Sequence, residues 1–160
     1  MNRKEVEPGM PAPDFTLPST KGDVSLSELL KSKTVVLAFY GHDGAEESRT
    51  ALSLFKEEYS VFDYLEAEVL GISVDSLDSH ASLVKEMGHL PYALVSDQGM
   101  TLGAQYGVLN EDGKGYRPAL YVINRWGNVS LKIPDFEVGN QEQYMYMLQA
   151  LGLNVLDEDR

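Results

Sequence analysis

Hydrophobic residues gather in short runs along the chain, and the first run is continuous from Thr34 to Tyr40. Continuous apolar runs of this length are typical of strands that are buried on both faces of a sheet. The predicted strands are 34–40, 68–75, 93–96, 119–123 and 129–133. Arg125–Asn128 separates the last two and predicts a tight hairpin turn, because Gly127 tolerates the positive φ that such a turn needs.

Between these runs the apolar positions recur every three or four residues, which predicts amphipathic helices. The longest begins at Ala45 and places apolar side chains on one face at Leu52, Phe55, Tyr59 and Phe62. A short helix follows Ser25, which forms a capping box with Glu28. Further helices are predicted at 77–88, 100–106 and 141–151. Alternating strands and helices with a late hairpin predict a mixed central sheet covered by helices.

Length and charge narrow the class of protein. A chain of 160 residues suits one domain, residues 1–160, in which residues 153–160 are expected to form a frayed acidic tail. Its net charge of −12 should repel nucleic acid and anionic membrane. The charged N-terminus is followed by no apolar run, which argues against a secretory signal and favours the cytoplasm.

The chain contains no cysteine. A disulfide, a thiolate nucleophile and a cysteine metal site are therefore impossible. The three histidines, His42, His80 and His89, have none of the spacings typical of metal ligands, so neither a metal site nor a cofactor is expected. A weak cation site at His42, Asp43 and Glu46 is a lesser alternative, and His80 is expected near a helix surface.

Several blocks in order resemble one family. They are Pro-Ala-Pro-Asp-Phe-Thr-Leu at 11–17, Val-Val-Leu-Ala-Phe-Tyr at 35–40, Glu-Val-Leu-Gly-Ile-Ser-Val-Asp-Ser at 68–76, Leu-Val-Ser-Asp at 94–97 and Tyr-Val-Ile-Asn-Arg-Trp-Gly-Asn-Val at 121–129. Together they resemble the peroxiredoxins of the AhpC/TSA superfamily, and among them the bacterioferritin-comigratory or PrxQ-like subgroup. The resemblance implies an α/β, thioredoxin-like fold and a thiol-dependent peroxidase ancestry.

The resemblance also locates an active loop, and this chain departs from it. The family reads Pro-x-x-x-Thr-x-x-Cys after the Phe-Tyr strand. That spacing places the proline at Gly41, the threonine at Ala45 and the peroxidatic cysteine at Ser48. The second cysteine of many subgroup members falls on Ser53. All of these family positions are changed, so no catalytic residue is expected in the chain as it stands.

The family also carries an arginine just before the fourth strand. Arg117 is the candidate by residue type, whereas counting back from Asn124 places the family position at Pro118. If a ligand pocket persists above the first strand, we expect Tyr40, His42, Ser48 and Arg117 to line it.

Replacing sulfur by oxygen at position 48 removes the family reaction, because a serine hydroxyl stays neutral where a thiol ionises. Glu46 and Glu47 precede Ser48 and would also oppose an anion there. The main hypothesis is therefore a redox-inactive, peroxiredoxin-like protein with a binding or regulatory role toward a protein or small-molecule ligand. One alternative is a thiol peroxidase whose cysteine at 48 was replaced by serine.

A second alternative is a non-thiol enzyme that uses the same pocket. Ser48 could be a hydrolase nucleophile with His42 as base and Asp43 or Asp75 as orienting acid. The Gly-x-Ser-x-Gly elbow of α/β-hydrolases is absent, however.

The last predicted helix has an outward face, with Met145 and Tyr146, that is a candidate dimer contact, and a monomer is the other expectation.

Overall fold

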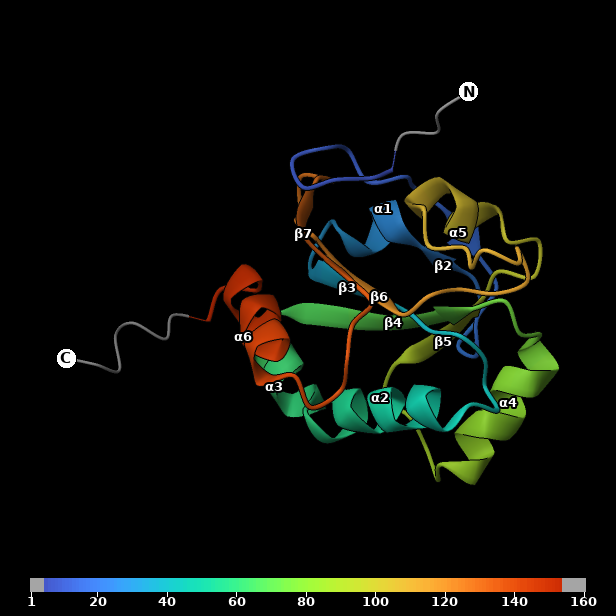
Figure 1. The fold of residues 1–160 in the computed structure, drawn as a ribbon. Coiled ribbons are helices and arrows are strands. Elements are labelled where there is room, and N and C mark those ends of the chain that lie inside the picture. The colour runs from blue at the N-terminus through green and yellow to red at the C-terminus, as the bar shows by residue number, and fades with distance from the viewer. Residues whose placement is uncertain (1–4, 154–160) are drawn as a thin grey trace.

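The central feature of the structure, a computed structural model that describes residues 5–153, is a mixed five-stranded sheet (Figure 1). Its strands lie in the order β5-β4-β3-β6-β7. Their bounds are β3 Thr34–Phe39, β4 Ala67–Ser73, β5 Ala93–Ser96, β6 Ala119–Ile123 and β7 Val129–Pro134. The strands β3, β4 and β5 are parallel, whereas β6 runs antiparallel to both β3 and β7. The predicted α/β, thioredoxin-like architecture is confirmed.

Helices cover both faces of this sheet (Figure 1). On one face lie α2 Glu46–Glu57, α3 Tyr59–Tyr64, α4 Leu77–Glu86 and α6 Gln141–Ala150, and on the other lie α1 Leu26–Leu29 and α5 Thr101–Tyr106. Side chains of β3 alternate between the two layers: Val36 and Ala38 pack toward α2, whereas Val35 and Leu37 pack toward α1. Burial on both faces explains why β3 is apolar throughout.

The two turn and cap predictions are confirmed. Ser25 is the N-cap of α1, and its hydroxyl accepts a hydrogen bond from the backbone N–H of Glu28. Gly127 has a φ of +89°, and the side chain of Asn124 accepts hydrogen bonds from the backbone of Trp126 and Asn128 to close the β6–β7 turn.

The long helix predicted from Ala45 is in fact two helices. α2 ends before Glu58, whose φ of −96° and ψ of 9° leave the helical region, and α3 follows at once. The N–H of Val61 bonds to the carbonyl of Glu58 over three residues, which tightens the chain there. The apolar positions Phe55 and Phe62 both reach the same core across this break, so the periodicity of the sequence did not reveal it.

A segment near the N-terminus runs along both outer edges of the sheet. The N–H of Gly9 bonds to the carbonyl of Val129 in β7. Eleven residues further on, Thr20 bonds through its N–H to the carbonyl of Leu94 in β5, and Ser19 forms a bridge with Val95. The strand β1 Thr16–Leu17 lies just before these contacts and pairs antiparallel with β2 Val24–Ser25, which follows them.

Among the described residues, no helix is long and apolar enough to cross a membrane. Most of the expected acidic tail, residues 154–160, lies outside the described part of the chain, and Leu153 packs against the core beside α6.

Candidate functional site

The candidate site lies where β3 ends and α2 begins. Tyr40 continues the strand, a loop follows, and Ala45 is the N-cap of α2 without a side-chain cap. Ser48 therefore sits in the first turn of the helix, where backbone N–H groups are free of intrahelical partners. Its side chain is almost completely buried, with 5% of the residue exposed. The fold thus places Ser48 at a buried position beside a helix N-terminus.

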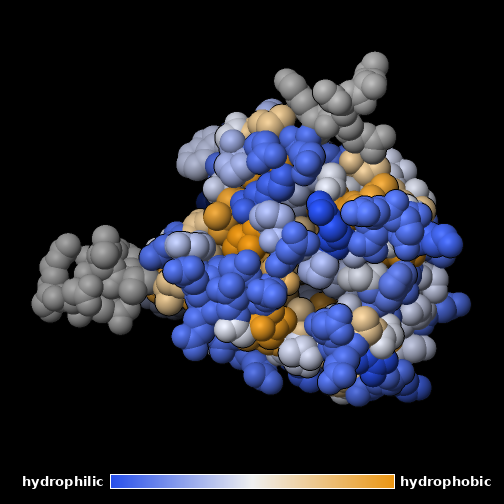
Figure 2. Space-filling model, viewed as in Figure 1, coloured by the Kyte–Doolittle hydropathy of each residue, from blue (hydrophilic) through white to orange (hydrophobic). Residues whose placement is uncertain are grey.

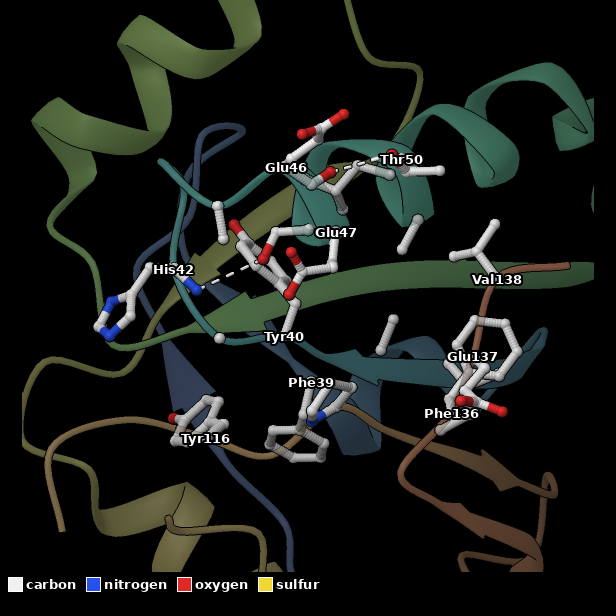
Figure 3. Close-up of a pocket in the computed structure, with 18 of the residues that line it drawn as sticks. Phe39, Tyr40, His42, Glu46, Glu47, Thr50, Tyr116, Phe136, Glu137 and Val138 are labelled. Carbon is white, nitrogen blue, oxygen red and sulfur yellow. Dashed lines mark hydrogen bonds between the residues drawn. The ribbon is translucent and has the colours of Figure 1, made fainter. Parts of the chain in front are cut away.

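A pocket of about 780 Å³ opens between this loop, α2 and the segment that follows β7 (Figure 3). Pockets of about 300–1,000 Å³ are typical of small-molecule sites. Tyr40, His42 and Ser48 line the pocket, as expected. The segment 135–138 forms the opposite wall, and the sequence had not indicated that it belongs to the site.

Arg117 does not line this pocket. It is exposed and lines a separate, much smaller cavity with Glu5 and Lys132, while its backbone N–H bonds to the carbonyl of Val108. Pro118 lines the main pocket instead. Of the two candidates for the family arginine position, Pro118 lies at the main pocket and Arg117 does not.

The residues considered for a serine hydrolase do not form a triad. Ser48 Oγ accepts a hydrogen bond of 3.4 Å from the backbone N–H of His42, not from its imidazole. The imidazole instead lies near a different group, with Nδ1 3.6 Å from Oδ1 of Asp75. Among the described residues, no hydrogen bond connects the His42 ring to Ser48. The geometry gives Ser48 no general base.

The nearest fixed cation also points away from Ser48. Arg49 follows Ser48 in α2, but its guanidinium donates to the carbonyl of Asp43 at 3.1 Å and pairs with Glu86 of α4 at 2.8 Å. Ser53, at the second cysteine position, lies further along α2, is half-buried and does not line the pocket. No Lys or Arg side chain is among the residues that line the pocket.

A buried polar network lies behind the loop, centred on Asp43. Its carboxylate accepts hydrogen bonds from the hydroxyls of Tyr40 and Ser79, both at 2.7 Å, and lies 2.8 Å from Nδ1 of His80. The other ring nitrogen of His80, Nε2, lies 3.0 Å from the carbonyl of Val95 in β5. His80 is completely buried, so its predicted place near a helix surface is wrong.

The chemistry of these partners assigns the protons. A carbonyl only accepts, so Nε2 of His80 must carry a proton to bond to Val95. Burial acts to raise the pKa of Asp43, but hydrogen bonds from His80, Ser79 and Tyr40 outweigh burial and hold that pKa below its ordinary value. The carboxylate is therefore ionised. The buried hydrogen-bonded pair of Asp43 and His80 anchors the loop to α4 and β5.

The same network affects the pKa and the orientation of the Tyr40 side chain. Burial, the negative charge of Asp43 and their hydrogen bond together raise the pKa of the Tyr40 phenol well above its ordinary value. The phenol is thus a neutral donor at physiological pH. The network holds Tyr40 in one orientation at the wall of the pocket.

Asp43, Asp75 and His80 carry ligating atoms within 4.8 Å of one another, although the sequence spacing had not grouped them. Both nitrogens of His80 and both oxygens of Asp43 are already hydrogen-bonded to protein groups. Asp75 accepts from the Ser73 hydroxyl and the Asp43 N–H. The grouping is explained by internal hydrogen bonds, and it removes Asp43 from the weak cation site considered with His42 and Glu46.

Comparison with known proteins agrees with this geometry. A model of the AhpC/TSA family matches residues 8–132. The chain is 36% identical over 155 residues to a chloroplastic 2-cysteine peroxiredoxin of Chattonella marina var. antiqua, covering 89% of this chain and 79% of the relative. It is 34% identical over 139 residues to a putative peroxiredoxin bcp of Coxiella burnetii, covering 83% of this chain and 91% of the relative.

The structural comparison points the same way. The crystal structure of peroxidoxin BcpB from Mycobacterium tuberculosis superimposes with a TM-score of 0.82 at 27% identity, covering 92% of this chain and 97% of that one. The family match, the relatives and the shared fold agree with one another. The chain belongs to the AhpC/TSA family, as a peroxiredoxin-like member that has no cysteine.

Proposed function

We propose that this protein has lost thiol peroxidase activity and uses the pocket beside Ser48 to bind a ligand in a binding or regulatory role. The observation that carries the proposal is the serine at the end of a family active loop that is otherwise folded and open to a pocket. A serine hydroxyl supplies no anionic nucleophile at neutral pH and forms no sulfenate-like product when it meets a peroxide.

The surroundings of Ser48 support loss of the whole site. Gly41, Ala45 and Pro118 stand at the other family positions, and the Arg49 guanidinium is committed to Glu86. A cysteine replaced by serine in an otherwise competent enzyme would leave those positions intact. These changes favour the binding role over the alternative of an active peroxidase with one substitution.

The proposal predicts that the purified protein consumes neither hydrogen peroxide nor an organic hydroperoxide, with dithiothreitol or thioredoxin as reductant. A cysteine-containing peroxiredoxin assayed at the same concentration serves as the positive control. Peroxide consumption followed by absorbance should match the protein-free background. Turnover that persists through a second chromatographic step would contradict the proposal.

A second prediction concerns a Ser48→Cys variant. Burial and the carboxylates of Glu46 and Glu47 disfavour a thiolate, while the helix N-terminus and the His42 N–H favour one. We expect a thiol pKa no lower than the ordinary value of about 8.5. The rate of alkylation by iodoacetamide between pH 5 and pH 10 measures it.

Ser53→Cys is the matched control, since it lies on the same helix away from the N-terminus and the pocket. Adding Gly41→Pro, Ala45→Thr and Pro118→Arg to Ser48→Cys should lower the thiol pKa and bring back peroxide consumption. A strongly lowered pKa in the single variant would mean that the surviving scaffold still stabilises an anion at position 48.

We infer a homodimer or monomer as the working assembly. The half-exposed Tyr146 on α6 supports a contact between copies. The high negative charge supports a ligand other than nucleic acid or an anionic membrane.

A further inference from the structure

The charged residues around the pocket all have one sign. Glu46 and Glu47 lie on the α2 side, and Asp135 and Glu137 lie on the segment that follows β7 (Figure 3). The two pairs thus face the same space from elements that are far apart in the sequence. The only other titratable groups in the lining are the imidazole of His42 and the phenols of Tyr40 and Tyr116.

These four carboxylates have no cationic partner in the described part of the chain. None of them lies within 4.0 Å of a Lys, Arg or His nitrogen there. Arg49 pairs with Glu86, and Lys132 pairs with Glu5 and Glu7, while Arg117 lines the smaller cavity that Asp135 also lines. Glu46, Glu47 and Glu137 therefore have no ion-pair partner in the described part of the chain.

The inner wall of the pocket is apolar. Leu52 and Phe55 of α2, Leu120 of β6 and Phe136 contribute to it, and the rings of Phe55 and Phe136 are stacked with centroids 6.2 Å apart. Figure 2 shows hydrophobic side chains reaching the surface among hydrophilic ones near α2 and the segment after β7. Space lined in this way accepts the hydrocarbon part of a ligand.

One buried polar group also faces this space. Ser48 lines the pocket and is 95% buried, and its hydroxyl accepts the His42 N–H but has no acceptor for its own proton among the described residues. A ligand in the pocket would therefore contact one buried hydroxyl in the pocket wall and carboxylates at the pocket opening.

We propose that the pocket binds an amphipathic organic cation, an amine or quaternary ammonium group attached to a hydrocarbon body. This inference rests on the proposed binding function and names the class of ligand. The hydrocarbon body lies against Leu52, Phe55 and Phe136, and the cation lies at the mouth between Glu47 and Glu137. The net charge of −12 favours the approach of a cation and opposes an anion of the same shape.

Three probes with the same eight-carbon chain test the proposal: octyltrimethylammonium, 1-octanol and octanoate. Binding to the full-length protein is measured by isothermal titration calorimetry and by chemical-shift changes at low and at physiological salt. We expect octyltrimethylammonium to bind at least about tenfold more tightly than octanoate, with 1-octanol between them and with affinity for the cation falling as salt rises.

The outcomes separate the two proposals. Equal binding of all three probes, or tighter binding of octanoate, would overturn the cation preference while leaving a ligand-binding pocket. No binding of any probe would count against both the ligand class and the proposed binding function. Peroxide turnover in the separate assay would overturn the loss of catalysis without bearing on the ligand.

A double variant Glu47→Gln and Glu137→Gln locates the cation. It should weaken the affinity for octyltrimethylammonium about five- to tenfold and leave the affinity for 1-octanol unchanged, because it removes charge and keeps the shape of the side chains. Glu57→Gln with Glu111→Gln removes the same charge from exposed positions outside the pocket and should change affinity less than twofold. An equal loss in both double variants would show a general charge effect and contradict a site between Glu47 and Glu137.

Discussion

Replacing His80 or Asp43 by alanine is expected to cost about 3–5 kcal/mol of the free energy of unfolding, because the first change leaves the buried Asp43 carboxylate without its partner and the second leaves three buried groups without theirs. The two side chains are 0% and 7% exposed, and Nδ1 and Oδ2 lie 2.8 Å apart. For a chain of this length such a loss corresponds to a fall in Tm on the order of 10 °C. Urea unfolding followed by circular dichroism measures both single variants.

The double variant Asp43→Ala and His80→Ala distinguishes an ion pair from two independent packing effects. The double variant removes the buried carboxylate together with its partner, although Tyr40, Ser79 and the Val95 carbonyl still lose a hydrogen bond, so it should be less destabilised than the sum of the single variants. Tyr40→Phe is the control variant, because it removes a single hydroxyl from the same network. It should lower the free energy of unfolding by about 1 kcal/mol. Additive losses would show that the pair is not coupled.

The pH dependence of this pair has a definite sign. The folded protein holds the pKa of Asp43 below the value of about 3.9 in an unfolded chain. The carboxylate therefore stabilises the fold above that value and loses its contribution as the pH falls through the folded pKa. The stability difference between wild type and Asp43→Asn should shrink as the pH falls from about 4 toward 3. A difference that grows on acidification would contradict the assignment.

Gly103→Ala should be the most damaging single methyl addition in the structure. A Cβ at Gly103 would lie 2.2 Å from Cε1 and 2.9 Å from Cδ1 and Cζ of Tyr116. That ring cannot move away freely, because its hydroxyl donates to the buried Asp97 and its edge packs against Phe39. We expect a loss of about 3 kcal/mol, the upper end for overpacking, despite the higher helix propensity of alanine.

Thermal unfolding of Gly103→Ala beside Gly99→Ala tests this expectation. Gly99 has only an ordinary contact of 3.7 Å to the side chain of Thr101, so alanine there should change stability by less than about 1 kcal/mol. Combining Gly103→Ala with Tyr116→Leu should cost less than the sum of the two, since the smaller side chain relieves the overlap. A neutral Gly103→Ala would show that the ring has room to shift.

The strands were predictable because their burial on both faces leaves a continuous apolar run in the sequence. β5, from Ala93 to Ser96, and β6, from Ala119 to Ile123, begin and end where the sequence placed them. The break at Glu58 was not predictable, since α2 and α3 present their apolar residues to the same core and the helical period continues across it. Periodicity reports which side chains face a core, not whether the backbone between them stays helical.

The sequence predicted pocket residues correctly only where their position along a single loop determines whether they line the pocket. Ser48 and Tyr40 were expected at the pocket because they flank the end of β3, and both line it. His80 was misplaced because its partner Asp43 is 37 residues away and only the fold brings the two together. Arg117 was expected to line the pocket and does not, because a shift of one residue on an extended segment turns a side chain to the opposite side, and Pro118 lines it instead.

The residues that run from Gly9 to Thr20 have a consequence for how copies of this chain behave at high concentration. By bonding to Val129 on one border of the sheet and to Leu94 on the other, this stretch occupies backbone groups that a foreign strand would otherwise use. A single excursion of the stretch away from the body would uncover both borders together. The attachment of residues 9–20 therefore opposes edge-to-edge polymerisation at both borders of the sheet.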